Sequence, residues 1–132
     1  MIKLKVLRGK KIYIAGHRGM VGSALLRYFK NNRINKLIYA DKKRLNLLDK
    51  KKVNEFIKKN KPHIIVNCAG RVGGILANYS YPVEFLNENI EIQLNLINAS
   101  FKNKIRHFIN LGSSCIYPKN ATQPIKEDYL LT

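Results

Sequence analysis

The sequence predicts an α/β fold in which helices cover a doubly wound, parallel sheet. Short β-branched runs alternate with helical patterns along the 132 residues, and such alternation requires crossovers between parallel strands. The hydrophobic fraction of 45% is that of a globular chain long enough for one domain. Three glycines stand at every third position after the first β-branched run, where a strand turns into a helix.

The first half of the chain supplies a strand, a helix and a second strand. Residues 11–15 (KIYIA) form a short apolar run of the kind that makes a buried strand. Residues 20–31 carry apolar side chains four residues apart, which predicts a helix with one apolar face. Residues 36–40 (KLIYA) predict the second strand.

The second half adds two strands and two helices. Asp49 suits a helix N-cap ahead of residues 50–60, and Pro62 ends that helix. The longest helix runs from 81 to about 102, opens with Pro82, and carries two apolar faces, so we expect it to be buried or covered by a partner. The remaining strands are predicted at residues 63–67 and 106–111, and the sheet is expected to be truncated after about four strands.

Gly16, Gly19 and Gly22 lie where the first strand ends and the first helix begins. Glycine there lets the backbone adopt positive φ and approach a pyrophosphate, while free N–H groups and the helix dipole face the anion. A plain strand-to-helix turn needs only one glycine. Three in register therefore favour a Rossmann-like dinucleotide site.

Four motifs narrow this interpretation: GHRGMVGSA (16–24), LNLLD (45–49), VGGI followed by AN and YP (72–82), and LGSSCIYP (111–118). With them, the chain from 11 to 132 resembles the GDP-L-fucose synthase family of the extended short-chain dehydrogenase/reductase superfamily. The resemblance implies an NADP-dependent oxidoreductase. Such an enzyme epimerises GDP-4-keto-6-deoxymannose at two carbons and then reduces the ketone by hydride transfer from NADPH.

The resemblance also implies the roles of individual residues. The pyrophosphate loop would consist of Gly16, His17, Arg18, Gly19, Met20, Val21 and Gly22. Further cofactor contacts would come from Lys42, Asn46, Leu47, Leu48, Ala69, Gly70, Arg71, Leu111 and Gly112. Ser113 would hydrogen-bond the sugar ketone, and Cys115 would be the acid or base for epimerisation.

Asp41 complicates the choice of cofactor. Arg18 and the basic residues 42–44 supply the cations that a 2′-phosphate requires, which favours NADP. Asp41, however, ends the second predicted strand about twenty positions after the glycines, where an acidic side chain binds the 2′-hydroxyl of NAD. The sequence favours NADP and leaves NAD open.

The proton donor expected for reduction is missing. Reduction in this superfamily uses a Tyr-x-x-x-Lys pair on a helix, and only Tyr39 and Lys43 have that spacing, directly after the second predicted strand. The resemblance places the pair and the sugar-binding domain beyond Thr132. We therefore expect residues 1–132 to be the NAD(P)-binding domain of an N-terminal fragment, inactive as a reductase alone and with its fourth strand an exposed edge.

Two rival functions remain. In another nucleotide-sugar epimerase or dehydratase, Cys115 would usually be a different small residue. A non-catalytic dinucleotide-binding module or redox sensor is compatible with the missing pair. The net charge of +17 raises nucleic acid or an anionic membrane as partners, but the lysines are spread in pairs and triplets without a nucleic-acid-binding motif. We expect a nucleotide sugar as the partner, and neither specific nucleic acid nor membrane.

Cys68 and Cys115 are far apart in apolar surroundings, which predicts reduced thiols and a cytoplasmic protein. No apolar run approaches the ~18 residues of a membrane span, and no cluster has metal-ligand spacing, so we expect no metal. The resemblance implies a homodimeric parent. The two-faced helix at 81–102 fits dimerisation as well as burial against the sheet.

Overall fold

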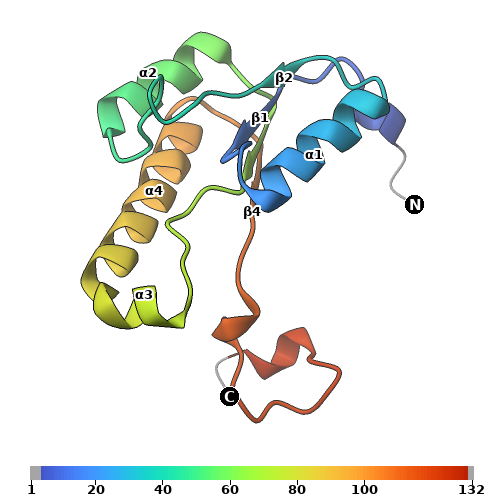
Figure 1. Ribbon diagram of the computed structural model, residues 1–132. Coiled ribbons are helices and arrows are strands. Elements are labelled where there is room, and N and C mark those ends of the chain that lie inside the picture. The colour runs from blue at the N-terminus through green and yellow to red at the C-terminus, as the bar shows by residue number, and fades with distance from the viewer. Residues whose placement is uncertain (1–3, 131–132) are drawn as a thin grey trace.

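The computed structural model describes residues 4–130 and contains a four-stranded parallel sheet between helices (Figure 1). The strands are β1 (Ile12–Ala15), β2 (Leu37–Ile38), β3 (Ile64–Asn67) and β4 (His107–Asn110). Their order in the sheet is β2-β1-β3-β4, and each neighbouring pair is parallel. The predicted α/β fold is confirmed, and β4 lies at an edge of the described sheet, as predicted.

The helices lie close to their predicted positions. They are α1 (Met20–Asn31), α2 (Lys50–Asn60), α3 (Ile75–Ser80) and α4 (Pro82–Lys102), with short 3-10 turns at Leu4–Leu7, Ser114–Ile116 and Glu127–Tyr129. The bounds of α1 and α2 are those predicted, and Asp49 caps α2 by accepting a hydrogen bond from the Lys52 N–H at 3.0 Å. Tyr81 is the N-cap of α4 rather than its first residue, and the six-residue α3 was not predicted.

The strands are shorter than predicted. β2 consists of two residues instead of the five at 36–40, because only Leu37 and Ile38 pair with β1. Lys11 lies outside β1, although its carbonyl accepts hydrogen bonds from the N–H groups of His63 and Ile64. The predicted segments therefore extend one or two residues beyond the paired residues, and the residue before each strand is basic.

Helices cover both faces of the sheet, as the doubly wound prediction requires. Successive β1 side chains point to opposite faces. Ile12 and Ile14 pack with Phe29 of α1, whereas Tyr13 and Ala15 belong to the core that α2 and α4 complete. Figure 1 shows α1 on one side of the strands and α2 with α4 on the other. Because every pair is parallel, the carboxyl ends of all four strands lie at one edge of the sheet.

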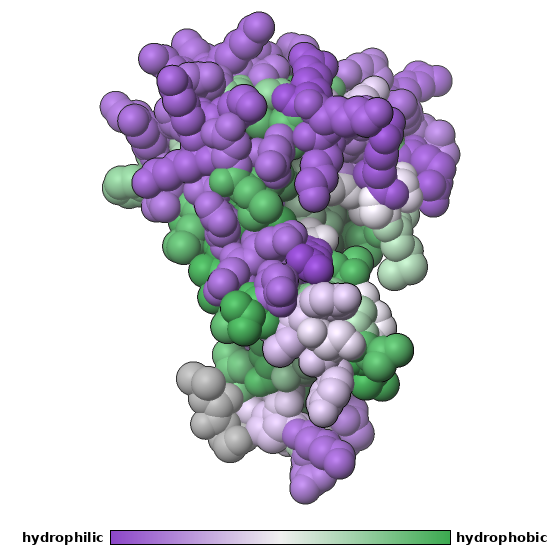
Figure 2. Space-filling view, turned by 60° about the vertical axis from the view of Figure 1, so that its left-hand side comes forward, coloured by the Kyte–Doolittle hydropathy of each residue, from purple (hydrophilic) through white to green (hydrophobic). Residues whose placement is uncertain are grey.

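α4 has the two apolar faces that the sequence predicted, and they have different environments. Ile92, Leu96 and Ala99 are buried against the sheet. The second face is exposed and consists of Leu86, Ile90, Leu94 and Ile97, whose relative exposures lie between 45% and 60%. Figure 2 shows hydrophilic side chains over the upper part of the molecule and apolar residues reaching the surface lower down.

Candidate functional site

The candidate residues gather at the carboxyl ends of the strands, the lower edge of the sheet in Figure 1. The glycine loop 16–19 follows β1, the loop 68–74 follows β3, and the segment 111–118 follows β4. Ligands of open α/β sheets bind in this position. The topology thus brings the motifs from three separate parts of the chain to one edge.

Gly16 must be glycine for two reasons. Its φ is +75°, which side chains with a Cβ rarely adopt. A Cβ at Gly16 would also lie 2.7 Å from the backbone N and Cα atoms of Ala69. The backbones of the loops after β1 and β3 therefore touch directly.

Gly22 and Gly19 pack the first turn of α1 against this loop. A Cβ at Gly22 would lie closer to the Gly16 carbonyl oxygen than atoms can approach. The Gly19 N–H donates to the Gly16 carbonyl at 3.0 Å, and Gly19 caps α1 without a side-chain hydrogen bond. Because the first N–H groups of a helix have no partner within it, the turn presents donors and the positive end of the helix dipole to an anion.

Arg18 and Asp41 form an ion pair, although the sequence associates Arg18 with NADP and Asp41 with NAD. The Arg18 Nε lies 2.9 Å from Asp41 Oδ1, and His17 Nε2 lies 3.3 Å from the same oxygen. The His17 imidazole is 11% exposed and packs against the Tyr39 ring, with the ring centres 4.9 Å apart and the ring planes tilted by 35°. The glycine loop is thereby joined to the segment after β2.

Four of the predicted cofactor contacts, Lys42, Asn46, Leu47 and Leu48, follow Asp41 in a compact turn. Lys42 is exposed, and the Asp41 carbonyl accepts hydrogen bonds from the two N–H groups that close this turn, at 2.9 and 2.8 Å. Asn46 Oδ1 accepts from the Leu48 N–H at 3.2 Å. The Leu47 carbonyl accepts from the buried Asn95 side chain of α4 at 2.9 Å. These bonds hold the LNLLD segment beside α4.

Asn67 connects the loops that follow β3 and β4. Its Oδ1 accepts from the Ala69 N–H at 3.0 Å, and its Nδ2 donates to Asn110 Oδ1 at 2.8 Å. The Leu111 N–H donates to the Asn67 carbonyl at 3.2 Å. Asn67 is buried, so these bonds satisfy both polar groups of its side-chain amide, whereas its partner Asn110 is exposed.

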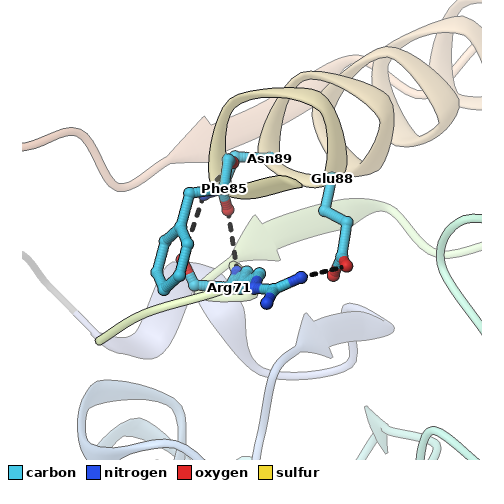
Figure 3. Close-up of polar contacts among 4 residues, drawn as sticks. All are labelled: Arg71, Phe85, Glu88 and Asn89. Carbon is cyan, nitrogen blue, oxygen red and sulfur yellow. Dashed lines mark hydrogen bonds and ion pairs between the residues drawn. The ribbon is translucent and has the colours of Figure 1, made fainter. Parts of the chain in front are cut away.

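A polar cluster holds the loop after β3 against α4 (Figure 3). The Asn89 side chain accepts from the Arg71 N–H at 2.8 Å and donates to the Arg71 carbonyl at 3.0 Å. The Arg71 guanidinium pairs with Glu88 and lies 4.8 Å from the centre of the Phe85 ring. Gly70 contributes to this fit, since a Cβ there would lie 2.9 Å from Asn89 Oδ1.

Ser113 and Cys115 lie on the segment that leaves β4. The Ser113 Oγ accepts a hydrogen bond from the Cys115 N–H at 3.2 Å, and both side chains are exposed. The other cysteine, Cys68, is half-buried, and this burial raises the pKa of its thiol. A Cβ added at Gly112 would meet no atom within 4 Å, so the segment is open at this point.

Tyr39 and Lys43 are not a helical pair. Both lie between β2 and α2, and the Tyr39 ring is engaged by His17. Within residues 4–130, no group of three or more His, Cys, Asp and Glu side chains has the geometry to hold a metal ion. No helix in that range is long and apolar enough to cross a membrane.

Sequence reasoning did not identify the amides that shape the site. Asn67, Asn89 and Asn95 fix the loops through side-chain hydrogen bonds to backbone or to another amide. Asn89 and Asn95, which lie on α4, could have been noticed in the sequence, because a polar residue that interrupts an apolar helix face needs a hydrogen-bond partner when it is buried. The partner itself could not be deduced, since it lies many positions away in the chain.

The comparisons with known proteins agree with this geometry. A model of the NAD dependent epimerase/dehydratase family matches residues 12–132. The chain is 45% identical over 127 residues to a GDP-L-fucose synthase of Sinorhizobium fredii, and it covers 40% of that relative's length. It is 43% identical over 122 residues to a GDP-L-colitose synthase of Yersinia pseudotuberculosis, of which it covers 39%.

A solved structure provides the same comparison in three dimensions. The chain superposes with a TM-score of 0.87 on MlghC, a GDP-mannoheptose C4 reductase from Campylobacter jejuni with NADP bound. The two are 36% identical, and the match covers 95% of this chain and 39% of that one. The chain therefore spans about two fifths of the length of the relatives that it matches.

Proposed function

Because the chain belongs to the NAD dependent epimerase/dehydratase family, we propose that it provides the NADP-binding domain of an oxidoreductase that acts on a nucleotide sugar. The observation that carries this proposal is the geometry of Gly16, Gly19 and Gly22, which together form the glycine cradle. Gly16 and Gly22 allow backbone contacts that any side chain would prevent, directly beneath the uncapped first turn of α1. This arrangement suits a pyrophosphate, because it brings the backbone close to the free N–H groups at the positive end of α1.

The residues around the cradle fit the rest of an NADP molecule. Arg18 is 77% exposed in the glycine loop, and Lys42 is exposed in the segment after β2. Both cations are therefore available to a 2′-phosphate. Ala69 and Gly70 would line the nicotinamide side, where Asn67 and Asn89 hold their backbone. When bound, NADPH supplies the hydride for reduction.

The proposed substrate is GDP-4-keto-6-deoxymannose, which the parent enzyme would convert to GDP-L-fucose. The support is the 45% identity to a GDP-L-fucose synthase across 96% of this chain. A different GDP-linked sugar is the second candidate, supported by the 43% identity to a GDP-L-colitose synthase and the 36% identity to a GDP-mannoheptose reductase. All three names share a GDP-linked sugar, so the class of substrate is better supported than the sugar.

We assign the sugar chemistry to Ser113 and Cys115. The Ser113 oxygen accepts a hydrogen bond from the Cys115 N–H, which leaves its own O–H free to donate to the ketone oxygen. The Cys115 thiol, two positions on and exposed, would remove or return a proton at the carbons beside the ketone. A hydrogen bond to the ketone oxygen makes those protons more acidic, so the two roles support each other.

The proposed assembly of the parent is a homodimer through the exposed face of α4. Leu86, Ile90, Leu94 and Ile97 recur at helical spacing and remain about half exposed. A single surface leucine needs no explanation, whereas a continuous apolar stripe on a long helix is typical of an interface. The same stripe on a second copy would provide a self-complementary surface.

The cofactor proposal is tested by titrating the purified chain with NADPH while following nicotinamide fluorescence. We expect saturable binding that is lost in Gly19→Val, because a branched side chain would occupy the space where the pyrophosphate approaches the backbone. Gly74→Ala is the matched control, since Gly74 has open space around it and a φ of −72°. An unchanged affinity in Gly19→Val would refute the cradle.

The substrate proposal needs a protein that can complete the reaction. A chimera of residues 1–132 with the unmatched part of the Sinorhizobium relative should oxidise NADPH in the presence of GDP-4-keto-6-deoxymannose. Cys115→Ser should abolish formation of the epimerised product. We expect residues 1–132 alone to leave NADPH unoxidised, and turnover by them would contradict the role given to the missing Tyr-x-x-x-Lys pair.

A further inference from the structure

The ion pair between Arg18 and Asp41 leaves polar groups of both partners unused. The Arg18 Nε and His17 Nε2 both contact Oδ1 of Asp41. Among the residues that the structure describes, none donates a hydrogen bond to the other carboxylate oxygen, Oδ2, and the side chain is 40% exposed. Asp41 therefore retains a free hydrogen-bond acceptor next to the glycine loop.

Arg18 is likewise only partly engaged. Its Nε lies nearest Asp41, and its two terminal nitrogens, Nη1 and Nη2, form no hydrogen bond within residues 4–130. The side chain is 77% exposed. Because a guanidinium carries five N–H donors in a fixed plane, four of them remain available on the side facing solvent.

We propose that Asp41 and Arg18 form a dual-specificity pair that lets this site bind NADH as well as NADPH; this inference rests on the proposed dinucleotide site. Asp41 Oδ2 accepts a hydrogen bond from the ribose 2′-hydroxyl of NADH, which is the role of an acidic residue at this position. The terminal nitrogens of Arg18 bind the 2′-phosphate of NADPH in the two-point manner of guanidinium groups.

The charge balance explains why the carboxylate does not exclude the phosphate. A free Asp41 would repel the 2′-phosphate, but its charge is already matched by Arg18 at 2.9 Å. Lys42 and Lys43 follow it directly and are exposed, so the surroundings remain cationic after the pair is formed. The pair can thus accommodate either the 2′-hydroxyl of NADH or the 2′-phosphate of NADPH.

His17 gives Asp41 a second partner that does not depend on Arg18. Its imidazole is nearly buried, packed against Tyr39, and 3.3 Å from Oδ1. Arg18 Nε and His17 thus both stay beside Oδ1 while the terminal nitrogens of Arg18 bind a phosphate. Asp41 is therefore held in one place for both coenzymes, which a single ion pair would not ensure.

The test compares the affinities of the purified chain for NADPH and NADH by nicotinamide fluorescence. Wild type should bind both, with dissociation constants within about tenfold of each other. Asp41→Asn should weaken NADH binding by about tenfold or more and leave NADPH binding unchanged or tighter. Arg18→Gln should weaken NADPH binding by at least about tenfold with little effect on NADH, as expected for losing a hydrogen bond to a charged group.

Glu55→Gln is the matched control for net charge. It removes one negative charge, as Asp41→Asn does, but lies exposed on α2 and outside the ion pairs of the described chain. Both affinities should be unchanged in this variant. Circular dichroism of each variant should match wild type, which separates a changed site from a changed fold.

The outcomes distinguish this inference from the proposal on which it rests. NADPH binding without NADH binding in wild type, or an affinity ratio that Asp41→Asn leaves unchanged, overturns the dual-specificity pair alone. Binding of neither coenzyme by the folded wild-type chain overturns the dinucleotide site, and the pair with it. Binding of both, with opposite shifts in Asp41→Asn and Arg18→Gln, supports both.

Discussion

The Asn89 side chain bonds both backbone polar groups of Arg71, accepting from its N–H at 2.8 Å and donating to its carbonyl at 3.0 Å. The amide thus pairs with the loop after β3 as a neighbouring strand would. The same Nδ2 also donates to the Phe85 carbonyl one turn earlier at 2.8 Å. A single side chain of α4 therefore determines where the backbone of Gly70 and Arg71 lies.

Asn89→Ala is expected to weaken NADPH binding by about tenfold and to lower stability. Removal of the amide leaves two partly buried backbone groups of Arg71 without partners, and each such loss costs about 1–3 kcal/mol. Fluorescence titration and urea unfolding measure the two effects. Asn87→Ala is the control, because Asn87 is exposed on the same helix. Equal behaviour of the two variants would remove Asn89 from the site.

Gly22→Ala should destabilise the chain by roughly 2–3 kcal/mol, at the upper end of the cost of overpacking. The added Cβ would meet the Gly16 carbonyl and also lie 2.9 Å from the His17 Cα, and these are backbone atoms that cannot rotate away. Urea denaturation gives the free energy of unfolding. Gly74→Ala, which meets no neighbouring atom, should change it little. A similar loss in both variants would contradict this account of the glycine loop.

The three longer helices and the glycine turn could be predicted from sequence because their causes are local, whereas the short α3 was not. The bounds of α1 and α2 follow from apolar spacing, from Asp49 as a cap and from Pro62 as a terminator. Gly16 indeed has a positive φ, as the turn after β1 suggested. Strand ends were predicted less well, since β2 ends where its pairing with β1 ends, which composition does not indicate.

The candidate site was only partly predictable, because its decisive contacts are long-range. Arg18 and Asp41 were each identified, but as competitors for the cofactor's 2′ position and not as partners 2.9 Å apart. The separation of 18 positions between Asn89 and Arg71 hides their hydrogen bonds from any local pattern. The functional roles of Ser113 and Cys115 stay predictions, since their one mutual hydrogen bond is local.

Asp49→Ala should lower the urea midpoint at neutral pH, and the difference from wild type should shrink in acid. The hydrogen bond from the Lys52 N–H lowers the pKa of Asp49 in the folded chain. Its stabilisation is therefore present above the unfolded-state pKa of about 3.9 and is lost as the pH falls through the lower, folded value. Asp49→Asn, which keeps an acceptor without the charge, should show a smaller effect at neutral pH. A pH-independent difference in Asp49→Ala would contradict the charge contribution.

Cys115 should react with iodoacetamide well before Cys68 at neutral pH. Cys115 is exposed, whereas Cys68 is half-buried and its pKa is raised by that burial, so less of it is thiolate. Peptide mass spectrometry over a time course measures both rates in one sample. The Cys68 rate should rise as the solution becomes more alkaline, because a larger fraction of its thiol is then ionised. Faster labelling of Cys68 in the folded chain would refute this ordering.

Leu94→Glu should convert a dimer of this chain to monomers. Leu94 is 52% exposed at the centre of the apolar stripe on α4, and Ile90 and Ile97 flank it one turn away on either side. In a paired interface the glutamate would be desolvated among apolar side chains, which should weaken association by at least about tenfold. Gln93→Glu adds the same charge at an exposed neighbour beside the stripe and should leave the dimer intact. Sedimentation velocity over a concentration series distinguishes the cases, and a wild-type chain that stays monomeric at about 100 μM, well above the Kd range of stable interfaces, would contradict the proposed assembly.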